Sequence, residues 1–248
     1  MKNPKPLLAA LGLLVFAPSL NAQVNGPTPY PDAKDEAAWP GKGPIRSFGW
    51  MVDNRKYFWT QRTADQGKVV FVGDSLTAGW KQPVLVQAFP NLKIANRGVG
   101  GDTSRGVLFR FKEDVLDLHP KAILLLVGGN DLSAHGDTAA AAGNIEAMIE
   151  MAHAADPKVP IIVAQGPPSG DPKAPQKPGA RADLNARIGK FADAKKNVTV
   201  VDLFTPLADA EGKPVPEYFA ADLVHIGPAG YQKWVQVLVP LFEKLGIK

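Results

Sequence analysis

The sequence predicts one α/β domain in which helices cover both faces of a parallel sheet. Strand-like and helix-like segments alternate along most of the 248 residues, a pattern typical of such sheets. One strand-like run, 122–127, contains only aliphatic residues, as expected for a central strand covered on both faces. The chain is 45% hydrophobic, which is enough for one complete core.

The first 22 residues have the three-part layout of a secretory signal peptide. Lys2 and Lys5 precede an apolar run at 7–16, and Ala22 supplies a small residue at the cleavage position. A membrane anchor is the alternative, but this run is shorter than the roughly twenty residues needed to span a bilayer. We therefore expect cleavage after Ala22 and a secreted or periplasmic protein.

The charge and cysteine content exclude several function classes. Without residues 1–22 the chain keeps 26 basic and 24 acidic residues, a net charge of +2. No basic stripe or polybasic patch is visible, so we expect neither nucleic-acid binding nor stable membrane insertion. The chain has no cysteine, which excludes thiol catalysis and thiolate zinc sites.

Residues 23–64 are predicted to form an N-terminal extension that precedes the first strand. Its first part, 23–43, is rich in proline and glycine. The second part, 50–64, is predicted to be an amphipathic helix that packs on the domain. On a helical wheel its large apolar residues fall on one side, and we expect them in the core rather than in a ligand platform: Trp50, Met51, Tyr57 and Phe58.

Residues 65–248 are predicted to form the main domain. Its strands are expected at 68–73, 92–96, 121–127, 159–165 and 198–202. Between and after them, apolar residues at helical spacing predict helices that include 107–118, 141–152, 184–191 and 231–242. Pro228 suits the first turn of the last helix.

The turn at 73–75 is the first candidate for chemistry. A β-branched run ends in Gly73-Asp74-Ser75, and a helix-compatible segment follows. This arrangement would place Ser75 just after the end of a strand and at the start of a helix. A serine hydroxyl becomes a good nucleophile only when a base takes its proton and donors hold the oxyanion.

Three further loops follow predicted strands. The glycines of the loop 97–105 allow a close backbone approach to an anion, and Asp102 or Thr103 can cap the next helix. A dinucleotide-binding fingerprint is disfavoured because its third glycine and its acidic partner are misplaced. Asn130 follows the central strand, where an asparagine can also simply cap a turn. The proline-rich loop 166–179 is expected to line one side of the site.

Asp222 and His225 lie just before the last predicted helix. At this spacing the carboxylate can accept from one imidazole nitrogen while the other faces a serine. A metal site is the alternative, but it would require further histidine or acidic residues nearby, and we see no such cluster. The other histidines are expected to be structural or solvated: His119, His135 and His153.

Taken together, four blocks of sequence resemble the GDSL/SGNH hydrolase superfamily. They occur in family order as Gly-Asp-Ser-Leu at 73–76, Gly-Asp-Thr at 101–103, Gly-Asn-Asp at 129–131 and Asp-x-x-His at 222–225. The resemblance covers about 67–246, and residues 96–108 look most like the catalytic subunit of platelet-activating-factor acetylhydrolase and its secreted bacterial relatives.

The resemblance implies a three-layer α/β/α sandwich with a five-stranded parallel sheet in the flavodoxin-like order 2-1-3-4-5. It also implies roles for individual residues. Ser75 would be the nucleophile, His225 the general base and acid, and Asp222 the orienting carboxylate. The oxyanion hole would be formed by the backbone N–H groups of Ser75 and Gly101 and by the Asn130 side-chain amide.

These observations lead to an expected function and two alternatives. We expect a serine esterase that removes short acyl groups, acetyl above all, from a small-molecule or glycan ester, without a metal or other cofactor. The first alternative is a phospholipid or ether-lipid acyl hydrolase. The second is a non-catalytic carbohydrate-binding protein on the same fold. The oligomeric state is not predicted.

Overall fold

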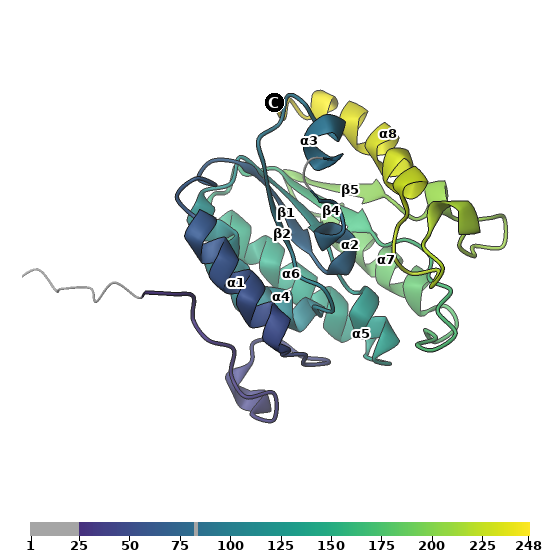
Figure 1. Cartoon of the computed structure of the whole chain (residues 1–248), viewed down its shortest axis with the longest axis horizontal. Helices are drawn as coiled ribbons and strands as arrows, with labels where there is room; N and C mark the ends of the chain where they lie inside the picture. The colour runs from purple at the N-terminus through teal and green to yellow at the C-terminus, as the bar shows by residue number, and fades with distance from the viewer. Residues whose placement is uncertain (1–24, 82–83) are drawn as a thin grey trace, which may run out of the picture.

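The computed structural model describes residues 25–81 and 84–248, so the predicted signal peptide lies outside the described residues. The described chain forms a five-stranded parallel sheet with helices on both faces (Figure 1). The strands are β1 (Val69–Gly73), β2 (Ile94–Gly98), β3 (Ala122–Leu126), β4 (Ile161–Gln165) and β5 (Val198–Asp202). Their order is β2-β1-β3-β4-β5, which confirms the predicted fold class and strand order.

The C-terminal ends of β1, β2 and β3 meet at one edge of the sheet. In the parallel register Gly73 of β1 stands beside Gly98 of β2 and beside Leu126 of β3. β2 therefore extends two residues beyond its predicted end at 96, because its pairing with β1 continues to Gly98. The strand order reverses at β1, and ligands of open α/β sheets bind in the crevice at such a switch point.

Two hydrophobic layers cover the sheet. α4 (Ser104–Asp114), α6 (Thr138–Ala155) and α7 (Ala180–Ala192) pack on one face, while α3 (Val84–Ala88) and α8 (Pro228–Lys244) pack on the other (Figure 1). Alternate residues of β1 belong to different layers, as the pleat of a strand requires: Val70 and Val72 face α4 and α6, and Val69 and Phe71 face α8.

The remaining elements are short, apart from α1, and several frame the crevice. They are η1 (Glu36–Ala38), α1 (Gly49–Gln61), α2 (Ser75–Ala78), η2 (Leu116–Leu118), α5 (Gly129–Ser133), η3 (Thr205–Leu207) and η4 (Pro216–Tyr218). Of the two residues considered as the cap of α4, Thr103 caps it, since its hydroxyl accepts from the Gly106 N–H group at 3.2 Å. Pro228 stands in the first turn of α8, as predicted.

The packing face of α1 differs from the prediction. Met51 and Phe58 are buried, but Trp50 and Tyr57 are 53% and 60% exposed. The buried face is rotated toward Arg55, because its guanidinium pairs with Glu113 at 2.6 Å and with Asp114 at 3.3 Å, both near the end of α4. The expectation that all four large residues pack on the domain is therefore wrong for Trp50 and Tyr57.

The extension is fastened to α4 by Arg105, whose side chain is buried. The guanidinium donates to the backbone carbonyls of Glu36, Trp39, Pro40 and Gly43 at 2.9 to 3.3 Å. Trp39 is buried against Tyr30 and Phe109. The segment before α1 is therefore part of the folded domain surface. Within the described residues, no helix combines the length and the apolar character needed to cross a bilayer.

Candidate active site

Ser75 is the first residue of α2 and follows directly on the end of β1. Asp74 caps this short helix by accepting from the Leu76 N–H group at 3.0 Å. The helix is held from the opposite side by α8, since the Tyr231 hydroxyl donates to the Leu76 carbonyl at 2.7 Å. As the first helical residue, Ser75 has a backbone N–H group without an acceptor inside the helix.

His225 lies between Ser75 and Asp222. Its Nε2 is 3.1 Å from the Ser75 Oγ, and its Nδ1 is 2.6 Å from the Asp222 Oδ2. The second carboxylate oxygen of Asp222 accepts from the backbone N–H groups of Val224 and His225, each at 3.0 Å. Burial alone would raise the pKa of Asp222, but these hydrogen bonds outweigh it and lower the pKa to about 2. An ionised carboxylate therefore faces the imidazole.

The turn that carries Asp222 and His225 is held in an uncommon conformation. Leu223 has a φ of +55°, which is costly for a residue with a branched side chain. The turn is fixed by two backbone hydrogen bonds: Gly170 N–H donates to the Leu223 carbonyl at 2.9 Å, and Ala220 N–H donates to the His225 carbonyl at 2.7 Å. The loop 166–179 thus helps to position the imidazole.

The three expected oxyanion-hole residues lie at the neighbouring ends of β1, β2 and β3. Gly101 has a φ of +82°, a conformation that favours glycine. Asn130 is the second residue of α5, and its side chain does not cap that helix. Instead the Asn130 Nδ2 donates to the Asp102 carbonyl at 2.9 Å, which joins it to the glycine loop. Ser75 and Asn130 line the same cavity.

A buried arginine that the sequence analysis did not single out supports this edge of the sheet. Arg110 of α4 donates to the carbonyls of Gly73 at 3.1 Å and Arg97 at 2.9 Å, and to the Asp102 carboxylate at 2.8 Å. It therefore links the strand before Ser75, the strand before the glycine loop and the loop itself. In the sequence of a helix, a buried arginine of this kind cannot be distinguished from a solvent-exposed one.

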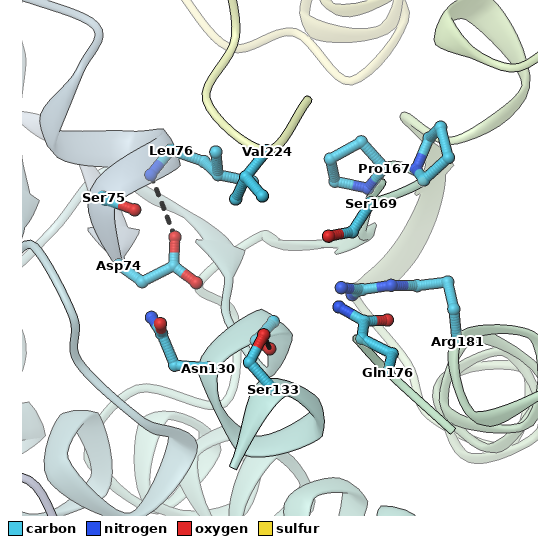
Figure 2. Close-up of a pocket in the computed structure, with 12 residues that line it drawn as sticks. Asp74, Ser75, Leu76, Asn130, Ser133, Pro167, Ser169, Gln176, Arg181 and Val224 are labelled. Carbon is cyan, nitrogen blue, oxygen red and sulfur yellow. Dashed lines mark hydrogen bonds between the residues drawn. The ribbon is translucent and has the colours of Figure 1, made fainter. Parts of the chain in front are cut away.

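The cavity beside Ser75 has a volume of about 30 Å³. Figure 2 shows Asp74, Ser75 and Asn130 along one wall, with Arg181 and Gln176 on the opposite wall. Pro167, Pro168, Ser169 and Gln176 of the loop 166–179 line the cavity, as the sequence predicts.

Two charged groups of the cavity have perturbed pKa values. Burial raises the pKa of Asp74 to about 6, although the Leu76 N–H group and the Arg181 charge act in the opposite direction. Burial lowers the pKa of Arg181 to about 10, and the charges of Asp74 and Asp131 oppose this shift. Neither residue was expected to matter, because the sequence pattern does not show which charged side chains become buried.

No histidine, His225 included, is among the residues that line this cavity. His119 ends η2 with a φ of +48°, His135 lies in a loop with a φ of +55°, and His153 is in α6. Across residues 25–81 and 84–248, no three acidic or histidine side chains are grouped so that they could hold a metal ion.

Comparison with known proteins identifies the family of the chain. The profile of the GDSL-like lipase/acylhydrolase family matches residues 71–233, which contain Ser75, Asn130, Asp222 and His225. The chain belongs to this family. It is accordingly an ester hydrolase, and the family implies small-molecule ester substrates.

Known proteins resemble the chain over most of its length. The platelet-activating factor acetylhydrolase IB subunit alpha2 of Rattus norvegicus is 29% identical over 203 residues, which cover 79% of this chain and 84% of the relative. A GDSL-like lipase structure from Bacteroides thetaiotaomicron is 29% identical with a TM-score of 0.68, covering 77% of this chain and 97% of that one. A structure of an acetylxylan esterase from Geobacillus stearothermophilus, 21% identical with a TM-score of 0.56, covers 71% of this chain and 94% of that one and shares the fold.

Proposed function

We propose that the protein is a secreted or periplasmic serine esterase that removes acetyl or similarly short acyl groups from a carbohydrate. The observation that carries the proposal is the chain of contacts from Ser75 through His225 to Asp222, at 3.1 and 2.6 Å. This arrangement provides a nucleophile, a base and a carboxylate that holds the base in one orientation.

In the first half of the proposed reaction, Ser75 Oγ attacks the ester carbonyl carbon while His225 Nε2 takes the hydroxyl proton. The negative charge that develops on the carbonyl oxygen is held by the N–H groups of Ser75 and Gly101 and by the Asn130 amide. Each such donor is typically worth about 3 kcal/mol in the transition state. His225 then donates the proton to the leaving alcohol, and the acyl group stays on Ser75.

In the second half, a water molecule replaces the alcohol. His225 takes a proton from this water as its oxygen attacks the acyl carbon, and returns the proton to Ser75 Oγ when the carboxylic acid leaves. Asp222 is ionised throughout, because its pKa is held near 2, and it stabilises the imidazolium that forms in each half.

The size of the cavity supports a short acyl group. A volume of about 30 Å³ is room for roughly two water-sized groups. Leu76 and Val224 give it apolar surface next to Ser75, and the prolines at 167 and 168 limit its length. An acetyl methyl group fits this space.

An exposed aromatic pair beside the glycine loop supports the proposal that the alcohol part of the ester is a carbohydrate. Phe48 and Trp50 are 40% and 53% exposed and stack with ring centroids 4.4 Å apart. The Trp50 indole N–H group donates to the Gly100 carbonyl at 2.9 Å, which fixes the pair next to Gly101. A flat, rigid aromatic face suits the C–H face of a sugar ring.

The reaction is tested with Ser75→Ala on p-nitrophenyl acetate. Turnover should be lost while the melting temperature stays unchanged, because a partly exposed hydroxyl contributes little to packing. A variant with more than a few per cent of wild-type activity would overturn the role of Ser75.

Substrate choice is tested by acid release from acetylated xylo-oligosaccharides and from p-nitrophenyl esters of increasing chain length. Activity that rises with chain length would contradict a short-acyl esterase.

The preference for a carbohydrate ester is tested separately with Trp50→Ala. We expect kcat/KM for an acetylated oligosaccharide to fall about tenfold, the value of one aromatic contact, beyond any loss on ethyl acetate that follows from the missing hydrogen bond to Gly100. Tyr57→Ala is the matched control, since Tyr57 is an exposed aromatic residue on the same helix with 60% exposure. Equal losses in both variants, or an equal loss on ethyl acetate, would remove the carbohydrate from the proposal.

Hydrolysis of a phospholipid or ether lipid is the second candidate. It is favoured by the similarity to platelet-activating factor acetylhydrolase subunits, whose name states their substrate. That substrate also carries an acetyl ester, so the small cavity suits both candidates. Comparison of acetylated oligosaccharides with an acetylated ether phospholipid decides between them, and a higher kcat/KM for the lipid would favour the second.

Export is proposed from residues 1–22 alone. N-terminal sequencing of the protein recovered from periplasm and culture medium tests it, with Gln23 expected as the first residue. A protein that stays in the cytoplasm with Met1 intact would exclude it.

A further inference from the structure

We infer that Arg46, which lies in the N-terminal extension, is a positioning residue for the oxyanion hole. Its Nη1 donates to the Asn130 Oδ1 at 2.8 Å and lies 3.4 Å from the Gly101 carbonyl. Arg46 thus contacts two of the three residues to which the proposed function assigns oxyanion binding, and the inference rests on that function. Arg46 precedes the segment 71–233 that matches the family.

The contact determines which way the Asn130 amide faces. A guanidinium has only donors, so the amide oxygen must point at Arg46 and the NH₂ group must point away from it. One hydrogen of this NH₂ group is used by the Asp102 carbonyl at 2.9 Å. The other is available for a substrate oxygen. A flipped amide would set donor against donor at Arg46 and acceptor against acceptor at Asp102.

Hydrogen bonds before and after Arg46 in the sequence hold its segment in place. Two residues earlier, the Pro44 carbonyl accepts from the Thr103 hydroxyl at 2.9 Å. Four residues later, Trp50 donates to the Gly100 carbonyl at 2.9 Å. The segment that carries Arg46 therefore lies along the glycine loop 97–105. A charged donor fixed in this way makes a stronger hydrogen bond to an amide oxygen than a neutral donor would.

Loss of the guanidinium should lower kcat more than it raises KM. Without Arg46 the Asn130 side chain can rotate or flip, and its donor is then misplaced where negative charge develops. Misplacement of this kind lowers kcat by about tenfold to a hundredfold. The hydrogen bond to Asn130 at 2.8 Å is much shorter than the contact to the Gly101 carbonyl at 3.4 Å, so Arg46 acts mainly through Asn130, and its removal should matter little once Asn130 is gone.

A double-mutant cycle tests this with the full chain and p-nitrophenyl acetate. The variants are Arg46→Met, Asn130→Ala and the double variant, with melting temperatures to show that each is folded. Asn130→Ala should lower kcat about 10² to 10³-fold. Arg46→Met should lower it about tenfold to a hundredfold with KM within twofold, and the double variant should lie within about threefold of Asn130→Ala.

Two further variants separate positioning from charge. Arg46→Lys keeps a donor and should recover part of the lost kcat. Lys42→Met removes an exposed positive charge from the same extension and should leave kcat unchanged. An equal loss in Lys42→Met would reduce the effect to net charge and overturn the inference.

The outcomes distinguish the inference from the function on which it rests. Multiplicative losses in the double variant, or a change in KM alone, would overturn the role of Arg46. An unchanged kcat in Arg46→Met beside a large loss in Asn130→Ala would do the same and would leave the proposed function intact. An unchanged kcat in Asn130→Ala would instead refute the oxyanion role of Asn130.

Discussion

At the residue scale, Asp222 shows how a local turn sets the charge state of a proposed catalytic group. Its carboxylate accepts two backbone N–H groups from its own turn in addition to the imidazole N–H group. The lowered pKa, about 2, means that Asp222 is ionised at every pH where the protein would act.

This leads to a prediction for Asp222→Asn. The variant keeps an acceptor for the backbone N–H groups but loses the charge that orients and stabilises the imidazolium. We expect kcat to fall by about 10³ to 10⁴ with little change in KM, and His225→Ala to be at least as damaging. Steady-state kinetics on p-nitrophenyl acetate measure both. A loss below tenfold would show that Asp222 does not orient the base.

Asp74 gives a second prediction, on stability. It is only 3% exposed, and its pKa is raised from 3.8 to about 6 by burial. Because the folded state binds this proton more tightly than the unfolded state, the stabilising effect is complete below pH 4 and is lost as the pH rises through 6. Relative to Asp74→Asn, the free energy of unfolding of the wild type should fall by about 2 kcal/mol between pH 4 and pH 7.

Urea unfolding of both proteins at several pH values measures this difference. The asparagine variant is a suitable reference because its amide oxygen can still accept from the Leu76 N–H group. Parallel stability curves for the two proteins would contradict the raised pKa of Asp74. A wild type that loses stability relative to Asp74→Asn as the pH falls would instead show that the carboxylate is stabilised in its charged form.

The sequence predicted some residues of the site and not others, for a physical reason. Ser75, Asp222 and His225 lie in short turns, whose chemistry is visible in a few neighbouring residues. Arg46, Arg110 and Arg181 owe their surroundings to segments far away in the chain, such as the contact between Arg46 and Asn130. A lone arginine in a loop or helix carries no local signal of such a partner.

At the element scale, the position of Ser75 depends on a close approach between the backbone of α2 and the end of β2 at Gly98. A Cβ at Gly98 would lie 2.1 Å from the Ala78 backbone nitrogen, which a rigid helix cannot accommodate. Gly98→Ala should therefore displace α2, lower the free energy of unfolding by about 1 to 3 kcal/mol and reduce kcat, because Ser75 moves away from His225.

Gly100→Ala is the matched control in the same loop. A Cβ at Gly100 meets nothing within 4 Å, and its φ is not positive. Thermal unfolding and kinetics of both variants test the close approach. Equal effects of the two substitutions would show that the loss comes from glycine flexibility in the loop rather than from contact with α2.

Helix α1 shows what the spacing of hydrophobic residues cannot predict. A helical wheel groups Trp50, Met51, Tyr57 and Phe58 correctly, but the arc that becomes buried also depends on Arg55. Its charge is paired by Glu113 and Asp114 of the next layer, so the helix is rotated and two aromatic side chains remain exposed. Patterns of hydrophobicity do not include charged residues that become buried because they are paired.

At the scale of the whole molecule, the strand order followed from the family resemblance, and the alternation of strands and helices indicated a parallel sheet. The position of the extension did not follow from either. Residues 25–48 carry little periodic pattern, and their place depends on hydrogen bonds to α4 and α6. Asn144 of α6, for example, donates to the Lys42 carbonyl at 2.7 Å and accepts from its N–H group at 3.1 Å.

The last prediction tests whether this extension folds together with the domain. Arg105→Met would leave the carbonyls of Glu36, Trp39, Pro40 and Gly43 without their common donor. Hydrogen bonds from a charged donor are stronger than neutral ones, and we expect their loss to lower the free energy of unfolding by about 3 kcal/mol. The segment should also open locally, so that trypsin cuts after the exposed Lys34 and Lys42 under conditions where the wild type stays intact.

Arg187→Met is the control, because Arg187 forms an exposed pair with Asp183 at 2.8 Å on the surface of α7, and exposed pairs contribute little to stability. Esterase activity should fall together with cleavage at Lys42, since the same segment presents Arg46 to Asn130. Cleavage at equal rates in the wild type and in Arg105→Met would show that the extension is held without Arg105. Rapid cleavage with full activity would show that the extension folds on the domain without contributing to its active site.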